Sequence, residues 1–162
     1  VYKRQGKHEA GSKFELLSWS QGEVRHNVWY TKGKSNKQAK AKRRRMLYLA
    51  GIAVELETAL RAVAVATKKK KYAVRMAHRA DRARKKMAAV AKAAGNVPEL
   101  RKIVKLSHSA GLKLNNKKAL TRAANSIAKV AKSLLAKHDG SKLGRIDKFL
   151  PKPKDYKGTP AK

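Results

Sequence analysis

The sequence predicts a mainly α-helical protein, a small helical bundle with an extended N-terminal arm and a basic C-terminal tail. Apolar residues recur every three or four positions from about residue 35 onward, which is the period of a helix with one buried face. No proline interrupts residues 35–95, and glycines follow the expected helix ends. We expect an arm over 1–37, a bundle over 38–139 and a tail over 140–162.

The arm differs in composition from the rest of the chain and holds both tryptophans. Two runs, 14–19 and 24–31, flank the polar segment Ser20–Glu23. The second run is rich in β-branched and aromatic residues with partial alternation, so a short hairpin is one alternative. An extended arm that packs its aromatic residues on a neighbour is the other, since two strands alone are marginally stable in water.

Two long helical patterns follow the arm. The first apolar stripe consists of Leu49, Ile52, Ala53, Leu56, Ala59, Leu60 and Val63. The second consists of Tyr72, Met76, Ala80, Ala83, Met87, Val90 and Ala94. One continuous helix would be about 90 Å long. We favour a break or bend near Thr67–Lys71, because four consecutive lysines repel one another in a helix.

Two further helices are expected before the tail. Gly95 and Asn96 end the second pattern, and Asn96, Pro98 and Glu99 together are typical of a new helix start. The inner face of this third helix is Leu100, Ile103, Val104 and Ser107, and Gly111 follows its end.

The fourth helix is expected to begin at Asn115 or Asn116 and to end before Gly140. Its apolar stripe is Leu120, Ala123, Ala124, Ile127, Ala131, Leu134 and Leu135. In the tail, Leu150–Lys154 alternates lysine with proline and is expected to be extended or polyproline-like.

Charge is the strongest indication of function. The 162 residues include 42 Lys and Arg against ten Asp and Glu, a net charge of +32. A compact domain that repels itself this strongly needs a polyanion, and nucleic acid fits because each phosphate bound releases a counterion. An anionic membrane surface is the lesser alternative. No apolar run reaches the length of about 18 residues that a membrane-spanning helix needs.

The charge is concentrated in residues 32–92, which hold 20 Lys and Arg against three acids. Within them Lys71, Arg75, Arg79, Arg82 and Lys86 repeat at helical spacing and form a basic ribbon suited to a phosphate backbone. The predicted nucleic-acid-binding residues are Lys40, Lys42, Arg43, Arg44, Arg45, Lys68, Lys69, Lys70, Lys71, Arg75, Arg79, Arg82, Lys85 and Lys86.

Enzymatic and metal chemistry find little support in the sequence. There is no cysteine, and the five histidines lack ligand spacing. Gly6–Glu9 resembles the stretch that opens RecB-type nuclease domains, but none of the acids downstream stands in the Glu-x-Lys motif that such a nuclease needs, so the resemblance implies an inactivated relic. No glycine-rich phosphate loop or serine elbow occurs. We therefore expect no catalytic residue, metal or cofactor, and no sequence-specific readout.

In outline the chain resembles the major coat (nucleocapsid) proteins of rod-shaped and filamentous archaeal viruses. The resemblance is one of architecture, an extended arm followed by a small helical bundle, and covers the whole chain. It implies a structural protein of the virion that self-associates or assembles with a related second subunit. It also implies that double-stranded DNA is wrapped along a helical filament in A-form, with the helices of 36–95 lining the DNA.

Two other classes remain open. A ribosomal protein in the cytoplasm would combine similar charge with ordered basic extensions in ribosomal RNA, and the Lys-Pro-Lys tail suits it. A histone-like nucleoid condenser is the second alternative. Double-stranded DNA is favoured as the partner, with RNA as the alternative.

Overall fold

The computed structural model describes residues 15–22, 25 and 37–158. These residues are mainly helical, and no strand occurs among them. A short helix, α2, spans Leu16–Ser20 and precedes the bundle. The bundle helices are α4 (Ala41–Ala64), α5 (Lys71–Ala94), α6 (Pro98–His108) and α7 (Lys117–Lys137). Two 3₁₀ turns follow, η1 (Gly144–Phe149) and η2 (Pro153–Asp155).

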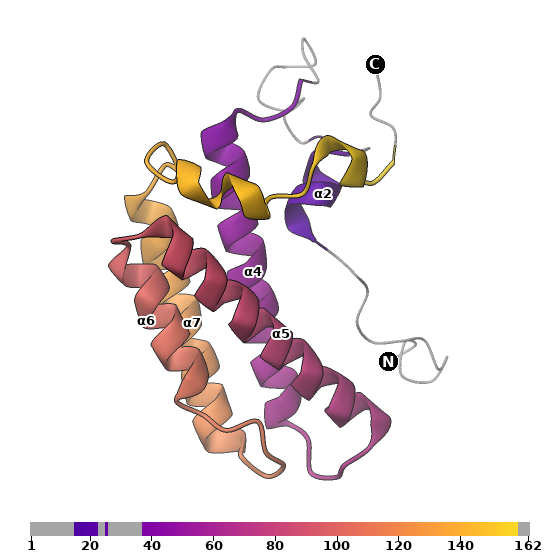
Figure 1. Cartoon of the computed structure of the whole chain (residues 1–162). Coiled ribbons are helices and arrows are strands. Elements are labelled where there is room, and N and C mark those ends of the chain that lie inside the picture. Colours follow the sequence, from indigo (N-terminus) through magenta and orange to yellow (C-terminus); the bar gives the residue numbers. More distant parts are fainter. Residues whose placement is uncertain (1–14, 23–24, 26–36, 159–162) are drawn as a thin grey trace.

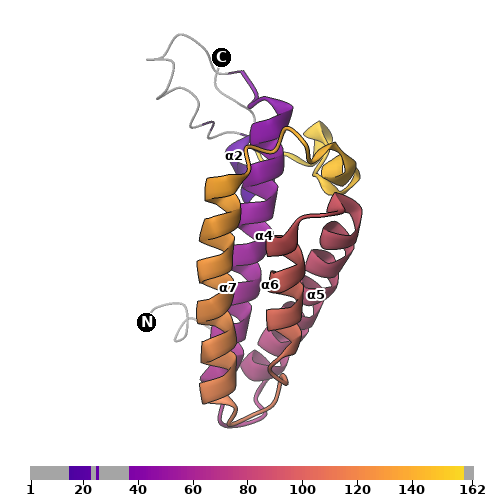
Figure 2. The same cartoon turned by 90° about the vertical axis from the view of Figure 1, so that its left-hand side faces the viewer.

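The bundle is antiparallel throughout, with each helix running opposite to the one before it (Figure 1). α4 packs against both α5 and α7, and the shorter α6 packs against α5 and α7 (Figure 2). The loops 65–70 and 109–116 meet at one end, where the Asn115 N–H donates to the Ala66 carbonyl at 3.2 Å. We call this the loop end of the bundle. The opposite end, where η1 crosses the helices, is called the tail end.

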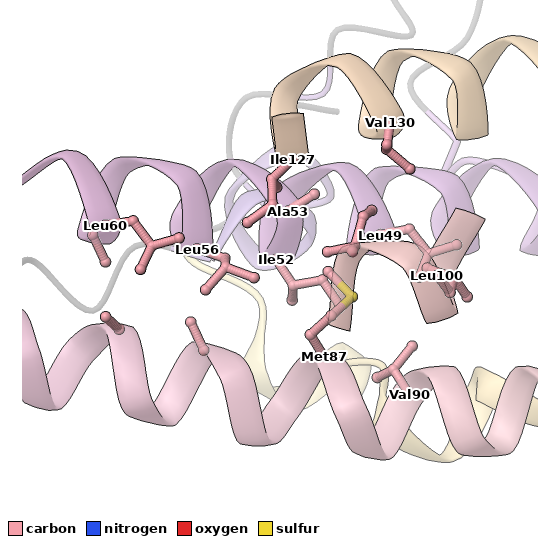
Figure 3. Packing of buried hydrophobic residues seen from close by; sticks show 14 of the residues in the cluster. Leu49, Ile52, Ala53, Leu56, Leu60, Met87, Val90, Leu100, Ile127 and Val130 are labelled. Atoms are coloured by element: carbon pink, nitrogen blue, oxygen red, sulfur yellow. The ribbon is translucent and has the colours of Figure 1, made fainter. Parts of the chain in front are cut away.

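The predicted apolar stripes form the core. All seven residues of the first stripe are buried, and most residues of the others are too. In Figure 3, Ile52 and Leu56 of α4 lie toward Met87 of α5, while Ile127 and Val130 come from α7 on the other side. Full burial of one such side chain stabilises the fold by roughly 1.5–3 kcal/mol. α4 is therefore the central helix of the bundle.

The stripes were predicted too wide at two positions. Tyr72 is 43% exposed and Leu135 is 41% exposed. Both residues lie at the margin of their helix faces, beyond the part that a neighbouring helix covers. Helical period alone does not set how wide the covered part is.

The predicted break between the two long helices is confirmed. α4 ends at Ala64 and α5 begins at Lys71, so Lys68–Lys70 lie outside both helices. The start of the bundle is later than expected, at Ala41.

The last two bundle helices begin where they were expected to begin. However, the asparagine side chains near their starts do not cap them. Pro98 occupies the first turn of α6, and Val97 stands at the N-cap with no side-chain bond. The Asn96 side chain accepts a hydrogen bond from Arg101 instead. Asn116 is the N-cap of α7, but its amide donates to the Gly111 carbonyl at 2.8 Å. Asn115 has φ 58° and forms the turn before it.

The first half of the possible hairpin, one of the two alternatives for the arm, is helical over Leu16–Ser20 instead. The Glu15 carboxylate accepts the N–H groups of Leu17 at 3.1 Å and Ser18 at 2.6 Å, and this capping begins α2. Leu17 is fully buried against the bundle, and Leu16 lies close to Gly51 of α4. The second half, 24–31, falls outside the described residues except for Arg25.

The segment predicted as a tail is partly folded into the bundle. Leu143 and Ile146 are buried in the same core as the helices, so the globule extends past the expected boundary at residue 139. Gly140 has φ 86° and approaches the Lys42 carbonyl so closely that a Cβ would clash with it. Residues 153–155 form a 3₁₀ turn, so Leu150–Lys154 is not extended throughout.

Candidate nucleic-acid interface

All eight acids in the described part of the chain are engaged within it. Ion pairs join Glu55 to Arg79 at 3.3 Å, Glu57 to Arg61 at 2.9 Å, Asp81 to Lys85 at 2.8 Å, Glu99 to Lys137 at 3.1 Å, Asp139 to Lys42 at 3.2 Å and Asp147 to Arg45 at 2.6 Å. Glu15 caps α2, and Asp155 accepts the Lys152 N–H at 3.0 Å. Acids therefore neutralise only a small share of the basic side chains.

Several of these pairs shift the pKa of the carboxyl group. Hydrogen bonds from Ser141 and Lys42 hold the pKa of Asp139 far below its usual range. The hydrogen bonds from the Arg45 guanidinium lower the pKa of Asp147. The backbone N–H at the start of α6 and the Lys137 side chain lower the pKa of Glu99. These carboxylates are ionised at neutral pH.

The basic cluster at the start of α4 has a largely structural part. Arg45 donates to both Asp147 oxygens and to the Gly140 carbonyl at 3.0 Å. Arg44 donates to the Tyr156 hydroxyl at 3.2 Å. Together with the Lys42–Asp139 pair, they attach residues 139–156 to α4. Of the five residues predicted here, Lys40 and Arg43 are exposed and do not take part in this attachment.

The ribbon predicted on α5 is divided by the fold. Arg79 pairs with Glu55 of α4, and the Lys86 ammonium lies 5.0 Å from the centre of the Tyr48 ring. Lys71 and Arg82 are exposed, as is Lys85 beside Asp81, while Arg75 is half-buried. The predicted ribbon thus includes two residues, Arg79 and Lys86, that lie next to the buried face of α5 and contact α4.

The loop end gathers lysines from two distant parts of the chain. The predicted Lys68–Lys71 lie in the loop after α4 and at the start of α5, and all four are exposed. Lys113, Lys117 and Lys118 lie in and after the loop that is hydrogen-bonded to it. Neither 58–80 nor 100–138 contains an acid. We call these seven the loop-end lysines.

The α6–α7 surface was missed by the sequence-based prediction. Residues 100–138 hold ten Lys and Arg and no acid, and all ten side chains are exposed. Three of them, Lys113, Lys117 and Lys118, are the loop-end lysines already named, and the other seven are Arg101, Lys102, Lys105, Arg122, Lys129, Lys132 and Lys137. A count of acids along the sequence would have found them, because this stretch is almost as basic as 32–92.

Shallow grooves cross this basic surface. One of about 550 Å³ lies between α5 and α6, with a floor of small residues such as Ala88 and Ala91 and a rim of Lys92, Arg101 and Lys105. Another of about 580 Å³ follows the first half of α7 and is lined by Lys117, Lys118, Thr121, Arg122, Asn125 and Ser126. Cations at the rim of a shallow groove suit phosphate oxygens.

The outer face of α4 lacks the basic side chains that the other three bundle helices carry. Residues 46–60 contain no Lys or Arg, and Val54 in their middle is 57% exposed. Glu55 and Glu57 in this stretch pair with arginines. Basic side chains thus lie on α5, α6, α7 and both ends, and the middle of α4 lacks them.

Within the described residues no group of His, Asp and Glu could hold a metal ion. Across the same residues, no helix is both long and apolar enough to cross a membrane. The described residues thus offer many exposed cations. No protein family model, curated protein or solved structure matches the chain.

Proposed function

We propose that this is a non-catalytic structural protein that packages double-stranded DNA through phosphate contacts, independently of base sequence. The main support for the proposal is the difference between the acidic and the basic side chains. Every described acid is used inside the fold, whereas the ten basic residues of 100–138 and most of those around the loop end face solvent. Such a surface gains most from a polyanion, because each phosphate contact releases a counterion.

The dimensions of the bundle suit a duplex. α4 has 24 residues and is therefore about 36 Å long, close to one turn of DNA at roughly 34 Å. Among the described residues, lysine and arginine far outnumber the exposed aromatic side chains, which are Trp19 at 48% and Tyr72 at 43% exposure. Backbone contact is favoured over base stacking, which single-stranded nucleic acid would use.

A coat protein of a virion is the form of packaging that we propose. In such a particle neighbouring copies must approach one another despite their charge. The outer face of α4, without Lys or Arg over 46–60 and with Val54 exposed, is where this repulsion is smallest. Copies would contact there and turn α5, α6 and α7 toward DNA.

The proposal is tested by purifying the protein from its native source without nuclease and identifying the nucleic acid that remains bound. We expect long, sequence-diverse double-stranded DNA, protected at a fixed number of base pairs per chain, and filaments in electron micrographs. A single defined ribosomal RNA would contradict the proposal and favour a ribosomal protein. Recovery without any nucleic acid at low salt would also contradict it.

A further inference from the structure

The loop end combines lysines with exposed apolar side chains. Of the six large apolar side chains that are exposed in the described residues, three lie here: Val65 (58%), Tyr72 (43%) and Leu114 (39%). They stand among the loop-end lysines, on two loops joined by the Asn115–Ala66 hydrogen bond. Two segments almost fifty residues apart thus form one surface.

This composition fits the groove of a duplex. Lysine ammonium groups bind phosphates on either side of a groove, and apolar side chains contact the sugars and base edges within it. The surface carries seven lysines and no acid, so its charge is fully complementary to nucleic acid. Apolar side chains exposed among lysines also suit a minor groove, where proteins place apolar wedges between base steps.

The loop end faces a different direction from the basic sides of the bundle. It lies at the end of the helix axes (Figures 1 and 2), whereas the exposed residues Lys102, Lys105, Lys129 and Lys132 lie within the lengths of α6 and α7. Duplex DNA is stiff over the length of one bundle, so a straight duplex along the sides does not also cross the end.

We infer that the loop end is a second DNA-binding site, which holds a different duplex from the one along the sides of the bundle. One protein then bridges two duplexes, and packaging includes cross-linking as well as coating. This inference rests on the proposed function and adds the mode of binding.

DNA is favoured over an anionic membrane as the occupant of the loop end. A protein that lies on a membrane concentrates its basic and apolar side chains on one face. Here the basic side chains continue over α5, α6 and α7, and the apolar part of the loop end consists of three side chains.

The test compares two variants with equal loss of charge. The loop-end variant carries Lys68→Gln, Lys69→Gln, Lys70→Gln and Lys113→Gln. The control variant, at the other end of the bundle, carries Lys142→Gln, Lys152→Gln, Lys154→Gln and Lys157→Gln. All eight lysines are exposed, so circular dichroism should show the same helix content in both. Sedimentation velocity with excess short duplex counts the duplexes bound per chain.

We expect the wild type and the control to carry two duplexes per chain and the loop-end variant to carry one. The salt dependence of binding that remaining duplex should be unchanged, because its contacts lie on the sides. A loop-end variant that still carries two duplexes would overturn the inference. So would a salt slope lowered by about 3 to 4, which would mean that end and sides contact the same duplex.

Vesicles of phosphatidylserine separate the membrane explanation. If the loop-end variant loses vesicle binding while still carrying two duplexes, the loop end is a membrane site and the inference is wrong. If the wild type binds one duplex only, the inference fails and the proposed function stands. If the wild type binds no duplex, both fail.

Discussion

Arg45 and Asp147 connect the first bundle helix to the segment after the last one. The guanidinium Nε lies 2.7 Å and Nη2 lies 2.6 Å from the two carboxylate oxygens, and Arg45 also reaches the Gly140 carbonyl. The Arg45 side chain is largely buried, while the Asp147 side chain is half exposed. This bidentate pair fixes residues 140–150 against the bundle, next to the buried Ile146.

Asp147→Asn should therefore lower stability in a pH-dependent way. The Arg45 hydrogen bonds lower the folded-state pKa of Asp147 from 3.8, so the stabilisation is complete above the unfolded-state pKa. It is lost as pH falls through the folded-state pKa. At pH 7 we expect a cost of about 1 kcal/mol or less, since the pair is partly solvated. That corresponds to a Tm decrease of roughly 2–4 °C.

The measurement is thermal unfolding of wild type and variant at pH 7 and pH 3 and equal ionic strength. The difference in Tm should shrink at pH 3. Asp155→Asn is the control, because that carboxylate accepts only the Lys152 N–H in the hydrogen bonds of the structure and should show a smaller effect. Equal differences in Tm at both pH values would rule out the pair as the cause.

Individual roles were the hardest feature to predict from sequence. Arg44 and Arg45 stand in a run of basic residues, and their partners Tyr156 and Asp147 are more than one hundred positions away. Arg84 was not singled out at all. It is 7% exposed and donates to the Ala110 carbonyl at 2.6 Å, and burial lowers its pKa. Only tertiary packing decides which cations of such a run are used internally.

At the scale of elements, the periodicity of apolar residues predicted the structure better than it predicted the roles of individual residues. The four bundle helices, the break after α4 and nearly all buried positions follow from apolar spacing and from glycine and proline. α2 was not foreseen, because five residues capped by Glu15 are too few for a periodic pattern. The packing of residues 140–150 was not foreseen either, because Leu143 and Ile146 are only two apolar side chains in a basic segment.

The structure predicts that α6 and α7 also bind DNA, whereas the sequence-based prediction placed all binding residues between Lys40 and Lys86. Replacing Lys102, Lys105, Lys129 and Lys132 by Gln removes four exposed cations from two helices. We expect the slope of log affinity for duplex DNA against log salt to fall in magnitude by about 3 to 4. Helix content should be unchanged, because none of these lysines has an ion pair in the structure.

The control for this prediction is the tail-end variant described above, with Lys142, Lys152, Lys154 and Lys157 replaced. It removes the same charge and should lower the slope by less. A larger loss from the tail-end variant would show that DNA lies against the other end of the bundle. No change from either variant would mean that α5 and the loop end carry the binding.

At the scale of the whole molecule, the residues that form the core are distinct from those that give the protein its net charge. The core is built from small and branched apolar residues around α4, while acids are used to hold basic side chains at helix ends and edges. The excess of basic residues remains on α5, α6, α7 and both ends. Net charge and the absence of Lys and Arg over 46–60 can be read from the sequence, whereas which side chains stay exposed depends on the arrangement of the helices in space.

The most direct test of DNA packaging through phosphates is the salt dependence of affinity, measured on two duplexes of equal length and unrelated sequence. We expect a slope of about −6 to −10 for log affinity against log salt, because each of many phosphate contacts releases a counterion. We also expect affinities for the two duplexes that agree within about twofold, since phosphates carry no base information. A flat salt response, or a preference of about 1,000-fold for one sequence, would contradict packaging through phosphates.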